Sequence, residues 1–127
     1  MLLVDAHLDL AMNAPKLIDV IQQMESNIEE PLSLPTIARK CKLSVRQIER
    51  LFVKYRQQTP SQFYLSLRLA YARQLLLNTS RSVIDVSIAS GFPSHSYFAA
   101  CYRKHYGCTP RSQREQVAIE QRGEAVG

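Results

Sequence analysis

The sequence predicts an all-α protein with about seven helices. Only 4 of its 127 residues are glycine, few segments alternate apolar and polar residues as strands do, and several segments repeat apolar residues at helical spacing. A chain of this length holds one domain or two very small ones, and its 46% hydrophobic content is enough for a core.

Two segments of the chain repeat one another. The first runs from Ser33 to Pro60 and the second from Ser82 to Pro110. The copies share serines that suit helix caps, apolar positions and a closing Thr-Pro, and the second copy has one inserted residue. Such a match over 28 residues is improbable by chance. Each copy predicts a short capped helix, a tight turn and a second capped helix. This is the helix-turn-helix arrangement, at about 33–55 and again at about 82–106.

One helix is predicted before the repeats. Residues 1–14 show no clear period and are predicted to be a linker or a disordered remnant. Pro15 suits a first helical position, and the helix then runs to about Glu29. Its predicted inward face consists of Leu17, Ile18, Ile21, Met24 and Ile28. The acidic residues lie mostly off that face, so we expect a brace that faces away from a polyanion.

A long helix is predicted between the two copies, at about 60–77. Its apolar residues cover most of the circumference, so it should be buried or sandwiched between two packing partners. Arg68 and Arg73 interrupt that surface. They are predicted to be ion-paired structural residues, with Glu49 or Asp85 as partners, and phosphate contact is the alternative.

A last short helix is predicted from Pro110 to about Val117. Residues 117–127 are predicted to be a disordered tail, and residues 15–116 form the predicted domain.

Positive charge is concentrated in the part of the chain that holds the repeats. From Leu32 to Arg114 there are fourteen Lys or Arg and two acids, a net charge of +12, whereas residues 1–31 carry −5. An 83-residue segment with that excess predicts a polyanion binder. A basic face kept only for solubility is the alternative, but it rarely needs so many charges.

The second helix of the first copy has the residues of a DNA recognition helix. Ser44 is a natural N-cap, and one face is apolar, with Ile48, Leu51, Phe52 and Tyr55. The other side carries Arg46, Gln47, Glu49 and Arg50. Arg can bind a guanine edge with two donors, and Gln can do the same for adenine. A solvated surface helix with two arginines is the alternative, and the repeat and the charge outweigh it.

The corresponding helix of the second copy presents smaller side chains. Its outward residues are His95, Ser96, Tyr97, Ala99 and Ala100, and charge comes only from Arg103 and Lys104 further along. Alanine can touch a thymine methyl group but cannot donate a hydrogen bond. We therefore predict that the first copy reads bases and that the second mostly positions the protein on phosphates.

No pattern typical of an enzyme or a metal site is visible. The three cysteines, at 41, 101 and 108, form no CxxC pair and are interpreted as reduced core residues. His7, His95 and His105 are scattered, and no Ser-His-acid set, paired-carboxylate site or Gly-rich phosphate loop is present. The sequence predicts no catalysis, no metal and no cofactor. Without a run of eighteen apolar residues or a signal-peptide pattern, a cytoplasmic protein is expected.

Three stretches carry a resemblance to a known family: EEPLSLPTIARKCKLSVRQIERLF, LRLAYARQLLLNT and SVIDVSIASGFPSHSYFAACYRKHYGCTP. Over about Leu17 to Arg114 they resemble the DNA-binding domain of the AraC/XylS transcriptional regulators. The most specific features are Gly91-Phe92, the step from Ser94 to Phe98, Tyr102-Arg103, and the run from Tyr106 to Pro110.

The resemblance implies a bacterial transcription regulator that binds specific sequences of double-stranded DNA. Its two recognition helices would enter successive major grooves on one face of the DNA, with the long helix setting their separation. The implied base contacts are Arg46, Gln47, Glu49 and Arg50 in the first helix, and His95, Ser96, Ala99 and Ala100 in the second. Phosphate contacts are expected from Ser44, Lys54, Ser94, Tyr97, Arg103 and Lys104. Lys42 and Ala100 stand where the family commonly has a small and a long polar residue, respectively.

The resemblance also implies partners. Members usually carry a separate effector or dimerisation domain before this one, and none is expected in this chain, which would be a fragment or a short stand-alone regulator. The sequence looks most like members whose N-terminal domain resembles a class I glutamine amidotransferase. RNA polymerase is an expected partner. The alternative function is a basic helical interaction module that binds RNA polymerase or another acidic protein.

Overall fold

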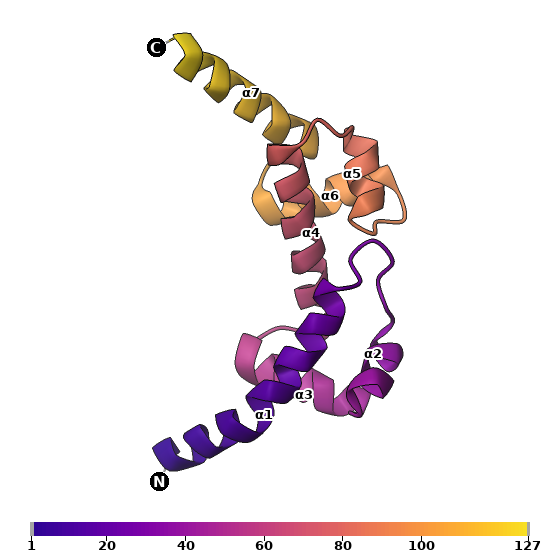
Figure 1. Ribbon diagram of the computed structural model, residues 1–127, viewed down its shortest axis with the longest axis vertical. Coiled ribbons are helices and arrows are strands. Elements are labelled where there is room, and N and C mark those ends of the chain that lie inside the picture. The colour runs from indigo at the N-terminus through magenta and orange to yellow at the C-terminus, as the bar shows by residue number, and fades with distance from the viewer. Residues whose placement is uncertain (1, 127) are drawn as a thin grey trace. The chain divides into compact units, whose positions relative to one another are not determined.

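The computed structural model describes residues 2–126, with side chains described for residues 13–120, and this part of the chain forms seven helices and no strand. The helices are α1 (Leu2–Glu25), α2 (Leu34–Cys41), α3 (Val45–Arg56), α4 (Pro60–Asn78), α5 (Val83–Ala89), α6 (His95–Tyr106) and α7 (Pro110–Val126) (Figure 1). The predicted all-α class is confirmed. None of the helices in the described part has the length and apolar character needed to cross a membrane.

The chain divides into two compact units, Met1–Leu65 and Ser66–Gly127, with the boundary inside α4. The first unit holds α1, α2, α3 and the start of α4. The second holds the rest of α4 with α5, α6 and α7. Each unit therefore contains one of the two predicted helix-turn-helix copies.

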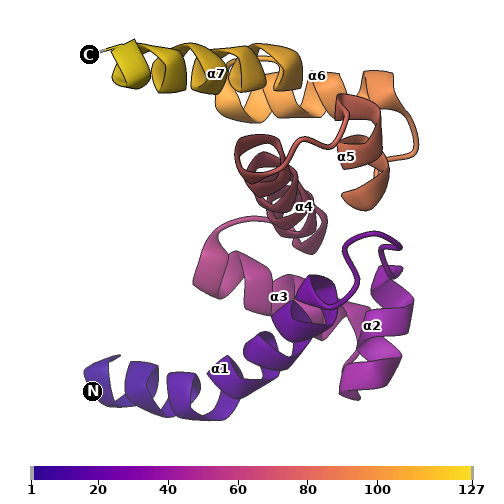
Figure 2. The same cartoon turned by 45° about the horizontal axis from the view of Figure 1, so that its top comes forward.

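In the first unit, α1 packs against both α2 and α3 (Figure 2). Fully buried Val20 of α1, Ile37 of α2 and Phe52 of α3 lie at the centre of this core. The inward face of α1 differs by one position from the predicted one. Ile18 was predicted to be buried but is 53% exposed, whereas Val20 is 0% exposed. The predicted set followed the 17, 18, 21 register, whereas the face that packs on α2 and α3 carries Leu17, Val20 and Met24.

A tyrosine of α4 fixes the connection between α1 and α2. The Tyr64 hydroxyl donates to the Asn27 carbonyl oxygen and accepts from the Leu32 N–H at 3.1 Å. Tyr64 lies 37 and 32 residues after these two partners, so the contact ties the loop at both of its ends to α4.

In the second unit, α5 packs on α6 and α6 packs on α7. Its core is an aromatic chain: the ring of Phe98 lies 4.9 Å from Phe92 and 5.8 Å from Tyr102, and Tyr102 lies 4.7 Å from Tyr106. Burial raises the pKa of the Tyr102 phenol, whose hydroxyl donates to Gln113 Oε1 of α7 at 3.1 Å. The second core thus combines this chain of rings with aliphatic Leu69, Leu76 and Val86.

The two arginines of α4 are structural, as predicted. Arg68 donates from Nε to the Ser90 carbonyl at 3.0 Å and from a terminal nitrogen to the Gly91 carbonyl, and its guanidinium lies 4.4 Å from the centre of the Phe92 ring. The Arg73 guanidinium lies over the Tyr106 ring at 5.5 Å. Glu49 or Asp85 was the predicted partner. The contacts described here are instead carbonyl oxygens and the faces of aromatic rings.

The predicted caps are confirmed in both copies. The hydroxyls of Ser33, Ser44, Ser82 and Ser94 each accept a hydrogen bond from the backbone N–H three residues later. Thr59 and Thr109 do the same for α4 and α7. Each cap satisfies one of the backbone donors that the first turn of a helix leaves without a partner. These local bonds fix where every helix after α1 begins.

The two ends of the chain differ from the prediction. Residues 2–14 belong to α1 and α7 continues to Val126, where a linker or remnant (1–14) and a disordered tail (117–127) were predicted. Residues 1 and 127 lie outside the described residues. The first segment is rich in Leu and Ala, and the second holds Ala, Glu and Gln; all four residue types favour helix even without a clear amphipathic period. Pro15 lies inside α1, not at its start, and removes one helical hydrogen bond there.

Arg114 of α7 satisfies the carbonyls at the end of α4. Its guanidinium donates to the carbonyl oxygens of Leu75 (3.4 Å), Leu76 (3.3 Å), Thr79 (3.2 Å) and Arg81. The last turn of a helix leaves its carbonyl groups without partners, so one side chain closes α4 and the turn into α5. This role of Arg114 was not predicted from the sequence.

We expect Arg114→Ala to destabilise the protein by roughly 1–3 kcal/mol, because the carbonyl oxygens at the end of α4, two of whose bonds to Arg114 are part-buried, lose a charged donor. Arg114→Lys should recover only part of the loss, since one ammonium group cannot serve several carbonyls in the planar geometry of a guanidinium. Urea unfolding followed by circular dichroism measures the effect. Arg111→Ala, which removes an exposed arginine from the same helix, is the matched control. Equal effects of the two alanine variants would contradict the assignment.

The two turns differ in one residue that carries strain. Lys42 has φ 57° and ψ 40°, in the left-handed region, and corresponds to Gly91 with φ 78°. In both turns the next N–H donates back to the first helix: Leu43 to the Ala38 carbonyl at 2.9 Å, and Phe92 to the Ser87 carbonyl at 3.0 Å. The turn geometry is thus the same, and Lys42 adopts it at a cost that glycine does not pay.

Lys42→Gly should therefore stabilise the protein by about 1 kcal/mol. Lys42→Ala is the control, since it removes the same charge but keeps Cβ, and it should not raise the urea midpoint. If glycine and alanine gave the same midpoint, the left-handed strain at Lys42 would not be the cause.

Candidate nucleic-acid interface

Helix α3 begins with a reciprocal pair of hydrogen bonds. The Ser44 hydroxyl accepts from the Gln47 N–H at 3.1 Å, and Gln47 Oε1 accepts from the Ser44 N–H at 2.8 Å. This capping box satisfies two donors at once and fixes the first residues of the helix. Gln47 therefore has a structural function that was not predicted. A bidentate contact between its amide and adenine would have to replace the bond to Ser44.

The outward face of α3 is a continuous stripe at helical spacing. Arg46, Glu49, Arg50, Val53 and Lys54 line a shallow hollow of about 350 Å³, and all five are exposed. Steps of three and four residues place them on one side of the helix. Ile48, Leu51 and Phe52 are buried on the other side. The predicted separation of a packing face from a projecting face is thus present.

Val53 was not among the predicted contact residues, although it is 60% exposed on this stripe. Its place three residues after Arg50 gives the same period that identified the other members, so the signal was available in the sequence. An exposed apolar side chain between arginine and lysine offers a methyl contact within a polar face.

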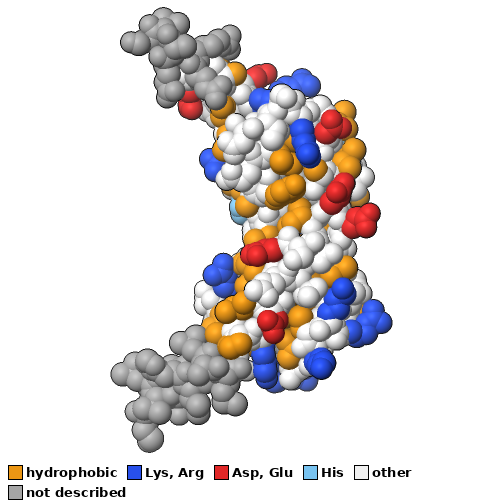
Figure 3. Space-filling model, in the orientation of Figure 1, with side chains coloured by type: hydrophobic (Ala, Val, Ile, Leu, Met, Phe, Trp, Pro, Cys, Tyr) orange, Lys and Arg blue, Asp and Glu red, His pale blue; other side chains and the backbone are white. Residues whose placement is uncertain are grey.

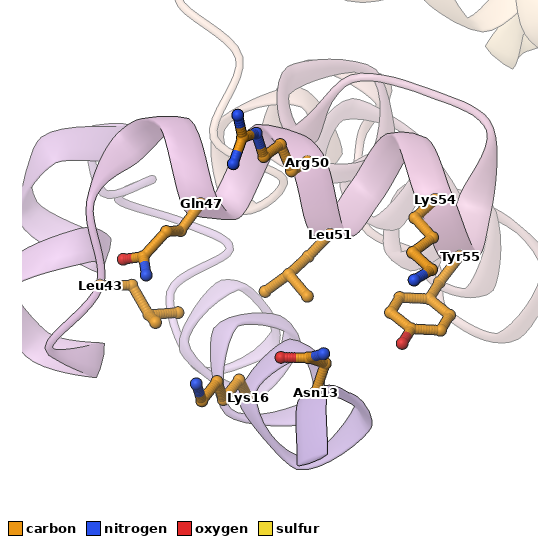
Figure 4. Close-up of a pocket in the computed structure, with 8 residues that line it drawn as sticks. All are labelled: Asn13, Lys16, Leu43, Gln47, Arg50, Leu51, Lys54 and Tyr55. Atoms are coloured by element: carbon orange, nitrogen blue, oxygen red, sulfur yellow. The ribbon is translucent and has the colours of Figure 1, made fainter. Parts of the chain in front are cut away.

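A second hollow lies between α1 and α3, as Figure 4 shows. It measures about 310 Å³, and its lining residues are Asn13, Lys16, Leu43, Gln47, Arg50, Leu51, Lys54 and Tyr55. Asn13 and Lys16 belong to α1, which was predicted to be a brace that faces away from a polyanion. The structure brings one lysine of this brace next to the candidate recognition helix.

Helix α6 presents a less charged face. Ser94 caps it, with the Tyr97 N–H donating to the hydroxyl at 3.1 Å. His95, Ser96 and Ala100 are exposed, but Ala99 is half-buried, so its methyl group is less available than predicted. Few polar donors therefore project from the first two turns of α6.

Tyr97 is 49% exposed and its ring lies 6.1 Å from Phe92. A hydrogen bond with Cys101 raises the pKa of the Tyr97 phenol above its ordinary value. Arg103 and Lys104 are exposed in the last turn.

Thirteen of the fourteen predicted contact residues are exposed, Ala99 being the exception. In Figure 3 the lower part of the molecule, which holds α2 and α3, carries several Lys and Arg side chains. Within the described residues no three His, Cys, Asp or Glu side chains come together in a way that could hold a metal ion. What this surface offers a ligand is charge and hydrogen-bond donors.

Comparison with known proteins gives the family. A family model described as a helix-turn-helix domain matches residues 37–116. The chain is 47% identical over 112 residues to the HTH-type transcriptional regulator GbdR of Pseudomonas aeruginosa, covering 88% of this chain and 30% of that protein. It is 46% identical over 107 residues to the regulator ArgR of the same species, covering 84% and 32%. The chain thus spans about a third of the length of these curated relatives.

Solved structures share the fold. A transcriptional regulator of the AraC-type DNA-binding class from Chromobacterium violaceum matches with a TM-score of 0.80 and 48% identity, over 85% of this chain and 96% of that one. The DNA-binding domain of AdpA, solved in complex with a target DNA, matches with a TM-score of 0.77 and 24% identity, over 82% and 94%. On the family match, the relatives and the repeated geometry, this chain belongs to the AraC-type helix-turn-helix DNA-binding domains.

Proposed function

We propose that this chain is the DNA-binding part of a bacterial transcription regulator, which binds double-stranded DNA with α3 and α6 in successive major grooves. The observation that carries the proposal is the outward stripe of α3, where Arg46 and Arg50 project from a helix fixed by packing and by its cap. Family membership supports it, as does the +12 charge of residues 32–114.

The proposed mechanism has two stages. In the first stage the basic surface binds DNA phosphates. Lys and Arg side chains that neutralise phosphates release counterions, and this favours binding to DNA of any sequence. Base edges then select the sequence: Arg50 and Arg46 bind guanine, Glu49 accepts from cytosine, and Val53 contacts a thymine methyl group. Gln47 takes part only where the gain from adenine exceeds the loss of its bond to Ser44.

Helix α6 is proposed to contribute mainly orientation. Ser94, Tyr97, Arg103 and Lys104 bind phosphates, and His95, Ser96, Ala99 and Ala100 face the bases with few donors. Base reading by α6 therefore depends on shape and on thymine methyl groups, with the half-buried Ala99 contributing least.

The proposal extends to the whole protein. Residues 15–116 would form the DNA-binding domain, acting in the cytoplasm of a bacterium without catalysis. An effector or dimerisation domain would be a further part of the regulator, and the subfamily with an amidotransferase-like N-terminal domain stays a prediction. Contact with RNA polymerase also stays a prediction.

Selection of bound duplexes from a random DNA pool, at two salt concentrations, tests the function directly. A motif of two half-sites about one helical turn apart would support binding of α3 and α6 in successive major grooves. A stronger base preference in one half-site would support unequal base reading by the two helices. A single half-site would limit the sequence reading to one helix. Binding without any motif would contradict the proposal and favour the interaction module.

We expect the affinity for the selected site to fall steeply as salt is added, with log Kd rising linearly with the logarithm of the salt concentration. Each phosphate contact releases counterions and contributes about 0.9 to the slope of that line. Fluorescence anisotropy on a labelled duplex, across a salt series, gives the slope. An affinity that stayed constant between low and physiological salt would rule out electrostatic capture.

Arg50→Ala and Arg103→Ala should separate base reading from positioning. Loss of Arg50 should cost about 1–3 kcal/mol of binding and relax the preference at one base pair, whereas loss of Arg103 should weaken all sequences alike. Binding to a panel of duplexes, each with one base pair changed, measures both effects. The two variants remove the same charge, so each controls for the other. Equal changes in specificity would refute the division of labour.

A further inference from the structure

The hollow between α1 and α3 has the composition of an anion site. Its cations are Lys16 from α1 and Arg50 and Lys54 from α3, and none of its eight lining residues is acidic. The amides of Asn13 and Gln47 add hydrogen-bonding groups. Leu43 and Leu51 supply the apolar part of the lining. Such a surface suits a small, strongly charged group that approaches from solvent.

Packing fixes the position of Lys16. Leu17 and Val20, which follow it on α1, are 7% and 0% exposed in the core with α2 and α3. Asn13 lies three residues before Lys16 and so shares its side of the helix. Lys16 is the single cation among residues 1–31, which also hold six acids, and it is exposed at this hollow. The fold thus places the one positive charge of this acidic segment beside α3.

The cations of the hollow divide into two groups. In Figure 4 the Arg50 guanidinium points away from α1, as a base-reading side chain would. Lys16 lies on the α1 side, and the Lys54 ammonium lies 5.8 Å from the centre of the Tyr55 ring, on the side of α3 that faces α1. Two lysines from different helices therefore border the hollow next to the stripe that is proposed to enter the groove.

We propose that the α1–α3 hollow binds a backbone phosphate of the DNA strand that borders the groove entered by α3. This inference rests on the proposed function. Lys16, with Lys54, holds the phosphate as a point charge, and Asn13 adds a neutral donor. Because phosphate contacts fix register and orientation, α1 then sets the position of α3 along the groove wall. A free phosphate-bearing metabolite has the same chemistry, so the experiment must separate the two sources.

The test compares Lys16→Ala, Lys16→Arg and Arg111→Ala by anisotropy on the selected duplex and on a random duplex, over a salt series. Lys16→Ala should weaken both duplexes by the same several-fold factor and lower the salt slope by about 1, as loss of one phosphate contact requires. Lys16→Arg should retain the wild-type affinity and slope. Arg111→Ala removes an equal charge from exposed α7 and should leave the slope nearly unchanged. Equal urea midpoints confirm that all variants fold.

Different results overturn different claims. If Lys16→Ala matched Arg111→Ala in affinity and slope, the phosphate site would be wrong while the function stood. If wild type showed no sequence preference, the proposed function would fail, whatever the slopes. Inorganic phosphate is titrated into the DNA-free protein by NMR as a separate arm. Saturable shifts at the hollow, together with unchanged DNA affinity of Lys16→Ala, would assign the hollow to a free anion and overturn the proposal.

Discussion

The candidate interface depends on the one-sided packing of α3. Ile48 and Phe52 are fully buried against α1 and α2, so the helix cannot rotate without exposing them. Burying a side chain of this size contributes roughly 1.5–3 kcal/mol, which outweighs any single polar contact on the other face. Arg46, Glu49, Arg50 and Val53 are therefore oriented by the residues buried on the opposite side of α3, and the proposed base contacts depend on the core of the unit.

The two units reach the same local geometry with different means. Both copies cap their helices with serine and turn through a left-handed residue, yet Lys42 occupies that position in one and Gly91 in the other. In the second unit, Arg68 also binds the carbonyls of Ser90 and Gly91 and stacks on Phe92. That turn is held by long-range contacts as well as by its own backbone, whereas the first turn relies on Leu43 returning its N–H to Ala38.

The outward faces diverge although the scaffold repeats. Packing restricts only the buried positions, so Phe98 and Tyr102 of α6 occupy the places of Ile48 and Phe52 while the exposed positions change freely. On α3 these are arginines, a carboxylate and a valine; on α6 they are small residues, with charge in the last turn. The proposed division between base reading by one copy and positioning by the other therefore requires no change in fold.

The sequence by itself determined the caps, the repeat, the helix class and the side of α3 that projects, because each depends on residues within one or two turns of one another. The capping box of Ser44 and Gln47 and the place of Val53 were equally local and could have been identified. Only the tertiary structure decided that Val20 is buried and Ile18 is not, that Arg114 closes α4 from α7, and that Lys16 lies beside α3. These depend on which face of each helix its partners cover and on contacts between residues far apart in the sequence, which periodicity along a single helix does not encode.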